Sequence, residues 1–301
     1  MSKKVWAHLA LFTVNLLYGI NYVVAKGLMP NVIKPNGFIL MRVSGAVLLF
    51  WLFVLNKLEK IDKKDYLTFA LCGLFGVGVN QLFFFNGLMR TSPLNSSIIM
   101  TTTPIIVFVL SIFILKEKPT PIKVIGILIG ASGSIALSIL SSGSSHLSSS
   151  EGDLYIFLNA LSYSFYLVLV KPLMKKYKPL TVITWVFTFG LIYVLLWPYS
   201  LKEVAEVNWS TMASDIPWRI AFVVVGVTFL PYLLTVVAMK EVSPSVASSY
   251  IYLQPVLAGI FIFIFAWFGD HDFTADFTWL KVFCAIFIFL GVYLVSKPEK
   301  S

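Results

Sequence analysis

The chain has 301 residues, of which 58% are hydrophobic and only 12% are charged, and its formal net charge is +9. Soluble domains carry about 25% charged residues, so this composition argues against a soluble protein. A basic chain can bind nucleic acid, but here Lys and Arg lie in short clusters between apolar runs, which is the pattern of membrane topology. The mean hydropathy of +0.87 therefore predicts an all-α integral membrane protein in contact with the lipid bilayer, with no nucleic-acid partner.

Ten apolar runs have about the 20 residues that a helix needs to cross a bilayer. The first follows Lys3 and Lys4, as in a signal peptide, but it contains Asn15 and Asn21 and lacks a small-x-small cleavage site, so we expect a retained helix. Lys and Arg are concentrated in segments that share a side with the N-terminus, which predicts an inner (cytoplasmic) membrane protein with both termini cytoplasmic. The predicted spans are residues 5–25, 36–55, 66–88, 94–115, 121–140, 153–174, 180–199, 218–238, 244–268 and 279–296.

The sequence contains an internal repeat. A stretch that begins Ser92-Pro and ends at Pro104 is matched 151 positions later by one that begins Ser243-Pro and ends at Pro255. Because a Ser-rich segment also divides the spans into two groups of five, we interpret the chain as a duplication. Two further pairs of segments match in the same order, residues 15–29 with 160–174 and residues 120–124 with 278–282.

Five spans per repeat is an odd number, so the second repeat must cross the membrane in the opposite direction. Such inverted-topology repeats are typical of secondary transporters, whose sites lie near the midplane on broken helices. Pro104 and Pro255 lie inside spans, where a proline removes a backbone donor and frees the carbonyl four residues earlier, on Met100 and Ile251. We predict helix hinges at both prolines. The predicted parts are a first five-helix repeat at 1–140, an extracytoplasmic linker at 141–152 and an inverted second repeat at 153–301.

These features resemble the EamA-like members of the drug/metabolite transporter superfamily. The resemblance rests on the five-plus-five spans, on Met41-Arg42 early in the second span, on the two Ser-Pro…Pro stretches and on Leu-Lys-Glu-Lys-Pro-Thr at 115–120. It implies a secondary carrier that exports or exchanges small organic metabolites such as amino acids by alternating access. The second half departs from the family pattern, because Phe187 aligns with Arg42 and Phe-Gly-Asp-His-Asp at 268–272 replaces the usual acidic turn.

Other functions fit the sequence less well. A nucleotide-sugar or sugar-phosphate transporter of the same superfamily would need several buried cations for phosphate, and Arg42 alone lies within a span. An intramembrane enzyme would need paired carboxylates, His or a nucleophile at depth, and no catalytic constellation, metal cluster or phosphate loop is found, so no cofactor is expected. A scaffold or receptor would explain neither the inverted repeat nor the prolines. A homo-oligomer is left open.

Polar residues inside spans are costly and mark candidate sites. In the first span Asn15, Tyr18 and Tyr22 share one helical face, and in the sixth Asn159, Tyr163 and Tyr166 do the same. Two such stripes would suit a cavity for a partly apolar solute. The alternative is that they tie helices together through hydrogen bonds.

Three other spans add candidates. Asn80 and Gln81 in the third span are adjacent, so we expect at most one of them to face a cavity and favour Gln81, which aligns with Tyr232. The hydroxyls near the prolines could contact solute or only allow close helix packing. Arg42 could pair with a substrate carboxylate or with helix-end carbonyls. The predicted substrate-binding residues are Asn15, Tyr18, Tyr22, Arg42, Gln81, Ser97, Thr101, Asn159, Tyr163, Tyr166, Tyr232, Ser248, Tyr252 and Gln254.

Overall fold

The computed structural model describes residues 2–55, 59–118, 120–141, 149–268 and 279–296, and the regular elements within these ranges are all helices. The first half contains α1 (Lys3–Leu28), α2 (Pro35–Val54), η1 (Lys63–Asp65), α3 (Tyr66–Gly73), η2 (Leu74–Gly78), α4 (Val79–Arg90), α5 (Pro93–Met100), α6 (Thr103–Leu115) and α7 (Pro121–Ser141). The second half contains α8 (Ser150–Lys176), α9 (Pro179–Leu196), α10 (Pro198–Ala205), η3 (Trp209–Thr211), α11 (Ile216–Val224), η4 (Val225–Phe229), α12 (Leu230–Ala238), α13 (Pro244–Ser249), η5 (Tyr250–Leu253), α14 (Gln254–Trp267) and α15 (Trp279–Ser296).

Within the described residues, eight helical stretches are long and apolar enough to cross a membrane. They coincide with eight of the predicted spans, and the predicted fifth and tenth spans coincide with α7 and α15. The prediction of an all-α chain of apolar helices is confirmed, whereas the count of ten membrane-spanning helices stays a prediction.

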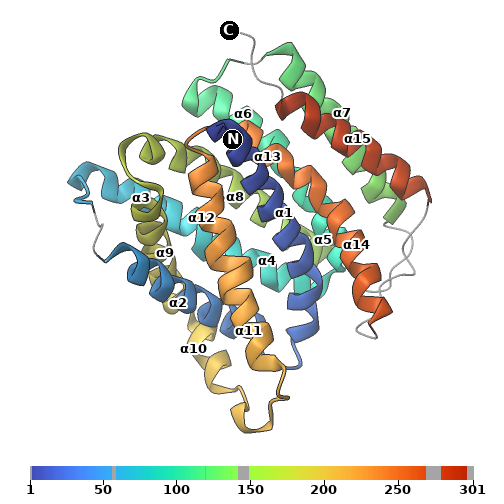
Figure 1. Cartoon of the computed structure of the whole chain (residues 1–301). Coiled ribbons are helices and arrows are strands. Elements are labelled where there is room, and N and C mark those ends of the chain that lie inside the picture. Colours follow the sequence, from blue (N-terminus) through green and yellow to red (C-terminus); the bar gives the residue numbers. More distant parts are fainter. Residues whose placement is uncertain (1, 56–58, 119, 142–148, 269–278, 297–301) are drawn as a thin grey trace.

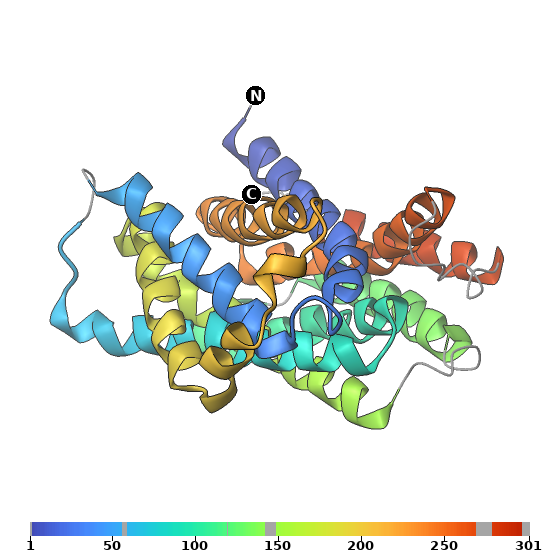
Figure 2. The same cartoon turned by 90° about the horizontal axis from the view of Figure 1, so that it is seen from below.

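The helices form an elongated array. Figures 1 and 2 show α7 and α15 side by side at one edge, α2 and α9 at the other, and α1, α4, α8 and α12 between them. The pair at the edge packs closely because glycines face each other. A Cβ on Gly291 would lie 2.6 Å from the backbone of Gly130, so a larger residue there would push α7 and α15 apart. Gly126 also faces α15, since a Cβ on it would lie 3.0 Å from Gly291 O.

The two halves are built alike. The first helix of each half packs against the third and fourth spans of the other half: α1 contacts α12 and α14, and α8 contacts α4 and α6. The end of α1 and the start of α8 meet at one residue, because Lys26 Nζ donates to Thr91 O and Thr91 Oγ1 donates to Asp153 Oδ1. This contact is one that antiparallel first helices would make, and the inverted direction of the second repeat stays a prediction.

Both Ser-Pro…Pro stretches begin with the same capped helix and then break. Ser92 and Ser243 are N-caps whose hydroxyls accept from Asn95 N and Val246 N, with a proline at the first helical position. The first stretch breaks between α5 and α6, directly before Pro104. The second breaks in the 3₁₀ turn η5, before Pro255.

The break near Pro255 corrects one detail of the sequence analysis. The carbonyl of Ile251 is not left free, because the 3₁₀ turn η5 gives it a donor in the backbone N–H of Gln254. A 3₁₀ turn bonds residues three apart and so does not depend on the N–H that Pro255 lacks. The interruption therefore leaves this carbonyl satisfied within the chain itself.

A second pair of irregularities was not foreseen. The π-helical turns η2 and η4 each have five residues, and their first residues, Leu74 and Val225, are 151 positions apart. This is the spacing that relates Ser92 to Ser243. π-turns are rare, occur mostly as single turns inside α-helices and are frequent at functional sites. Their occurrence at equivalent positions marks the third and eighth spans as matched, bent elements.

Candidate functional site

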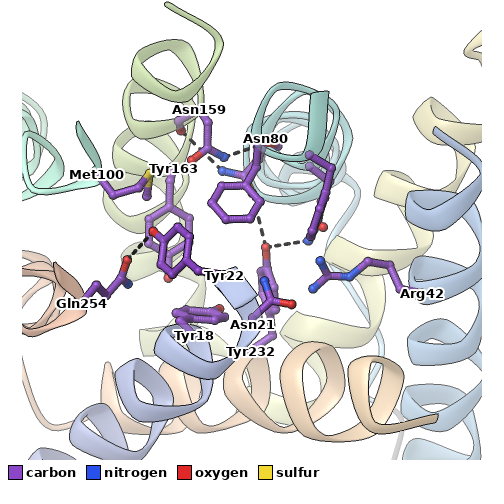
Figure 3. Close-up of a pocket in the computed structure, with 13 residues that line it drawn as sticks. Tyr18, Asn21, Tyr22, Arg42, Asn80, Met100, Asn159, Tyr163, Tyr232 and Gln254 are labelled. Atoms are coloured by element: carbon purple, nitrogen blue, oxygen red, sulfur yellow. Dashed lines mark hydrogen bonds between the residues drawn. The ribbon is translucent and has the colours of Figure 1, made fainter. Parts of the chain in front are cut away.

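A cavity of about 60 Å³ lies between the two halves, where α1, α2, α4 and α5 of the first half face α8, α12 and α14 of the second (Figure 3). Both π-turns are close to it, because η2 leads into α4 and η4 leads into α12. Its lining is aromatic and amide-rich and holds one charged side chain among the described residues. The lining residues are Tyr18, Asn21, Tyr22, Arg42, Asn80, Gln81, Phe84, Phe85, Met100, Asn159, Tyr163, Tyr232 and Gln254.

Gln81 and Tyr232 are repeat-related residues that meet directly across the interface. Gln81 Nε2 donates to the Tyr232 hydroxyl at 3.0 Å, and that hydroxyl donates to Gly76 O at 2.9 Å. Because the hydroxyl hydrogen goes to a carbonyl, which can only accept, Gln81 must present its NH₂ group to Tyr232. The amide orientation is thus determined, and Gln81 Oε1 is buried with no hydrogen-bond partner among the described residues.

Asn80 and Asn159 form a reciprocal pair between α4 and α8. Asn159 Nδ2 donates to Asn80 O at 2.8 Å, and Asn80 Nδ2 reaches Asn159 O at 3.4 Å. Since both acceptors are backbone carbonyls, Asn159 must turn its oxygen away from this contact. Asn159 Oδ1 is buried, and the described part of the chain supplies no partner for it.

The cavity position of Asn80 contradicts the expectation that at most one of Asn80 and Gln81 faces a cavity, because both line it. Successive helical residues are about 100° apart, so two neighbours can border the same space when it wraps around one side of the helix. Asn80 borders it beside α8 and Gln81 beside α12. The prediction that only one of the two residues faces a cavity assumed that their helix borders the cavity along one narrow face.

A chain of hydrogen bonds positions Gln254 at the opposite wall. Asn15 Nδ2 donates to Leu11 O, so Asn15 Oδ1 accepts from Gln254 Nε2 at 2.8 Å. Gln254 Oε1 then accepts from the Tyr22 hydroxyl at 2.8 Å. Asn15 does not line the main cavity, and its contacts show that it orients Gln254. The break at η5 places Gln254 at the start of α14, where its side chain can make these contacts.

Arg42 is almost completely buried, with 3% of its surface exposed, and lies on α2 beside the cavity. Its Nε donates to Thr228 Oγ1 at 2.9 Å, and its Nη2 lies 3.4 Å from Val227 O. The guanidinium carbon lies 4.4 Å from the centre of the Phe85 ring, a cation–π distance. No acidic side chain in the described ranges forms an ion pair with it. Figure 3 shows the guanidinium directed toward Asn21.

Several predicted residues lie away from this cavity. The hydroxyls of Ser97, Thr101 and Ser248 donate to carbonyls three residues earlier in their own helices, on Leu94, Ile98 and Ser245. These contacts agree with the alternative that such residues serve helix packing.

Tyr252 covers Gly130, and its hydroxyl donates to Ile127 O at 3.4 Å. Tyr166 covers Gly76, where an added Cβ would lie 2.5 Å from the ring, and its ring centre is 6.3 Å from that of Tyr232. Tyr166 therefore stands behind Tyr232 and supports the wall of the cavity without lining it.

Five lining residues were missed by the sequence analysis: Asn21, Asn80, Phe84, Phe85 and Met100. Phe84 and Phe85 follow Gln81 by three and four positions, so helical periodicity from Gln81 could have found them. Asn21 follows Tyr18 by three positions in the same way. Met100 gives no local signal, since it is an apolar residue within an apolar span.

Comparisons with known proteins give a family for the whole chain. The model of the EamA-like transporter family matches twice, at residues 5–139 and 150–297, which confirms the predicted duplication. The uncharacterized transporter YyaM of Bacillus subtilis (strain 168) is 30% identical over 262 residues, which cover 84% of this chain and 81% of YyaM. The WAT1-related protein At3g18200 of Arabidopsis thaliana is 24% identical over 75% of this chain and 63% of its own length.

A solved crystal structure shares the fold, with a TM-score of 0.70 over 96% of this chain and 95% of that chain at 16% sequence identity. The apolar helices, the doubled architecture and the cavity between the halves are those expected of a membrane carrier for small molecules. Together with the twofold match of the family model, they show that this chain belongs to the EamA-like transporter family.

Proposed function

We propose that this transporter moves zwitterionic metabolites, amino acids first among them, across the cytoplasmic membrane by alternating access through the cavity between its halves. The observation that carries the proposal is the combination in one buried cavity of an uncompensated guanidinium and fixed amide oxygens. The carboxylate of an amino acid would match the first, and its ammonium group would match the second.

The charge of Arg42 supports a substrate carboxylate. A buried charge without a counter-ion is costly in a membrane, and such groups mark substrate pathways. Two of its five N–H donors are used by Thr228 and Val227, both neutral acceptors. A carboxylate would accept charge-assisted hydrogen bonds, which are about twice as strong as neutral ones.

The amide oxygens support an ammonium group on the same substrate. Gln81 Oε1 and Asn159 Oδ1 are held by their own NH₂ contacts, and Asn21 Oδ1 is a third buried oxygen with no partner among the described residues. Unsatisfied buried acceptors cost free energy, and an ammonium group offers three donors to them. The aromatic side chains of Tyr18, Tyr22 and Phe84 line the remaining space and would cover an apolar substrate side chain.

The size of the cavity bears on the mechanism. Pockets for small organic ligands usually enclose about 300–1,000 Å³, whereas this cavity measures about 60 Å³. An amino acid therefore requires the walls to separate before it can bind. The interruptions at η2, η4, η5 and the α5–α6 break lie on the helices that would have to move.

A phosphorylated substrate is less well supported. Phosphate recognition uses several cations, and Arg42 is the single basic residue among the described residues of the cavity lining.

Counterflow in proteoliposomes tests the proposal. Liposomes containing the purified protein and preloaded with unlabelled L-leucine should accumulate labelled L-leucine, and a panel of labelled metabolites would define the range. Empty liposomes give the background rate. If no member of a broad panel is exchanged by protein that is shown to be folded, the transport proposal is wrong.

The proposed orientation has a separate test. Figure 1 shows the start of α1 and the segment from α10 to α11 at opposite ends of the array. In a chain whose native cysteines are replaced by serine, a cysteine at Lys63 should react only from the cytoplasm and one at Ser210 only from outside. The reverse pattern would overturn the orientation and leave the cavity argument intact.

A further inference from the structure

The two π-turns are held by different chemistry, although they occupy equivalent positions. In η2 the carbonyls of Phe75 and Gly76 accept hydrogen bonds from the hydroxyls of Ser162 and Tyr232, at 2.7 and 2.9 Å. Both donors are neutral, and both come from the second half of the chain.

In η4 the carbonyl equivalent to Gly76 O, 151 positions later, is Val227 O. It faces Arg42 Nη2 at 3.4 Å, while Arg42 Nε donates to Thr228 Oγ1 at 2.9 Å. The Thr228 hydroxyl in turn donates to Val223 O at 2.8 Å, a hydrogen bond across five residues within the same span. A charged side chain of the first half therefore holds the π-turn of the second.

Arg42 thus connects the cavity to η4 through side-chain hydrogen bonds to Thr228 and Val227. Its bond to Val227 O is long, and both of its acceptors are neutral. A carboxylate beside the guanidinium would be the stronger acceptor. Nε and Nη2 form one edge of the guanidinium, and a carboxylate bound bidentately along this edge would compete with Thr228 and Val227 for the same donors.

We propose that Arg42 is shared between the η4 turn and the anionic group of the substrate, so that substrate binding withdraws Arg42 from Thr228 and Val227 and releases the bend in the eighth span. Arg42 would then be the residue through which occupancy of the cavity reaches a moving helix. Thr228 is a positioning residue here, since it accepts a hydrogen bond from Arg42 and does not line the cavity. The inference rests on the proposed function, because it needs a substrate with an anionic group. It assigns the release to one half of the chain, since η2 is held by neutral hydroxyls that do not compete for a carboxylate.

Hydrogen–deuterium exchange of the full chain in lipid nanodiscs tests this device. L-leucine should speed exchange in residues 223–231 of the wild type by about tenfold, the effect expected from losing hydrogen bonds to a charged group, and leave residues 74–79 unchanged. Isopentylamine, which is leucine without its carboxylate, should leave both segments unchanged. If isopentylamine releases residues 223–231 as leucine does, the anionic group is not the trigger and the inference fails.

Two variants separate the holding contact from the binding of substrate. Arg42→Gln should speed exchange in 223–231 without any substrate. Thr228→Val leaves the Arg42 guanidinium in place and nearly preserves the side-chain shape at position 228. It should also speed exchange in 223–231. This variant should bind L-leucine at least as tightly as the wild type, and L-leucine should cause no further change in its exchange. Unchanged exchange in 223–231 in Thr228→Val overturns the inference, even if Arg42→Gln does not fold.

A matched control lies on the other π-turn. Ser162→Ala should speed exchange in 74–79 and preserve the leucine response of 223–231.

Failure of this inference is distinguishable from failure of the proposed function. Leucine counterflow without any change in 223–231 overturns the coupling alone, whereas the absence of counterflow for every amino acid contradicts the substrate class on which it rests.

Discussion

The two halves of this transporter share a backbone plan and differ in the chemistry that they bring to the cavity. Lys26 and Lys171, 145 positions apart, both donate to carbonyls where the third or the eighth span ends: Lys26 to Leu88 O and Thr91 O, and Lys171 to Met239 O and Val242 O. These carbonyls are themselves related by 151 positions. The framework is therefore symmetric to the level of single hydrogen bonds.

The cavity is not symmetric. Arg42 in the first half is matched by Phe187 in the second, whose ring lies 4.8 Å from that of Tyr232. Gln81 is matched by Tyr232 itself. Among the described lining residues, the first half supplies the charge, three of the five amides and four of the six aromatic rings, and the second half supplies two amides and two tyrosines. The zwitterionic substrate proposed above has two unlike ends, so an asymmetric lining inside a symmetric frame would let the protein orient it while the halves move in equivalent ways.

The largest effect is expected at the most asymmetric position. Arg42→Gln should lower substrate affinity by about 30-fold or more, the usual consequence of removing one partner of a buried charged pair. Counterflow as a function of L-leucine concentration measures this. The control is Arg219→Gln, which removes an arginine paired with Asp215 outside the cavity and should leave uptake unchanged. Wild-type affinity in Arg42→Gln would contradict the assigned role.

The next effect concerns the hydroxyl of Tyr232. Tyr232→Phe removes the donor to Gly76 O and the acceptor of Gln81 Nε2, and two buried groups lose a partner, so uptake should fall by about tenfold. Tyr252→Phe is the matched control, because its hydroxyl makes a single long contact away from the cavity. Uptake of that variant should stay within about twofold of the wild type. Equal losses in the two variants would mean that the effect is one of packing.

The framework symmetry can be tested at the two lysines. Lys26→Met and Lys171→Met each remove an ammonium group that satisfies carbonyls at the end of a span, so each should lower the free energy of unfolding by about 1.5–3 kcal/mol. Urea unfolding in detergent, followed by circular dichroism, gives the two values. A loss at one lysine and none at the other would break the equivalence of the halves.

The smallest effects are expected where α10 binds the start of α2. Glu203 accepts from Asn36 N at 2.7 Å and Gly37 N at 3.0 Å, and a negative charge at a helix N-terminus is favourable, so Glu203→Gln should cost about 1 kcal/mol. Glu206 is a more exposed partner of Lys34, at 2.7 Å, and Glu206→Gln should cost less. Thermal unfolding of both variants checks this order.

The effect of Glu206→Gln on thermal stability should depend on pH with a definite sign. The hydrogen bond from Lys34 lowers the pKa of Glu206 below its usual value of 4.5. The ion pair therefore stabilises the folded state above pH 4.5 and is lost as the pH falls through the lowered pKa. Wild type and Glu206→Gln should differ in thermal stability at neutral pH and converge in acid. A difference that grows in acid would show that another group is responsible.

Much of the architecture could be predicted from local patterns. Hydropathy located the helices, and the spacing of Ser92, Pro104, Ser243 and Pro255 identified both the repeat and the two breaks. These features are local, because a run of apolar residues or a proline acts on the helix that contains it. Periodicity within single helices also pointed to Tyr18 and Tyr22 on one wall of the cavity.

The sequence by itself determined that this protein is a duplicated helical membrane protein of the EamA-like type, because helix formation and membrane insertion depend on composition and short-range pattern. Tertiary structure decided which polar groups meet: Gln81 with Tyr232, and Arg42 with Thr228. Partners more than 100 positions apart leave no local trace, and neither do the π-turns that their hydrogen bonds hold in place. The tertiary contacts therefore define the site, and the sequence defines the frame that carries it.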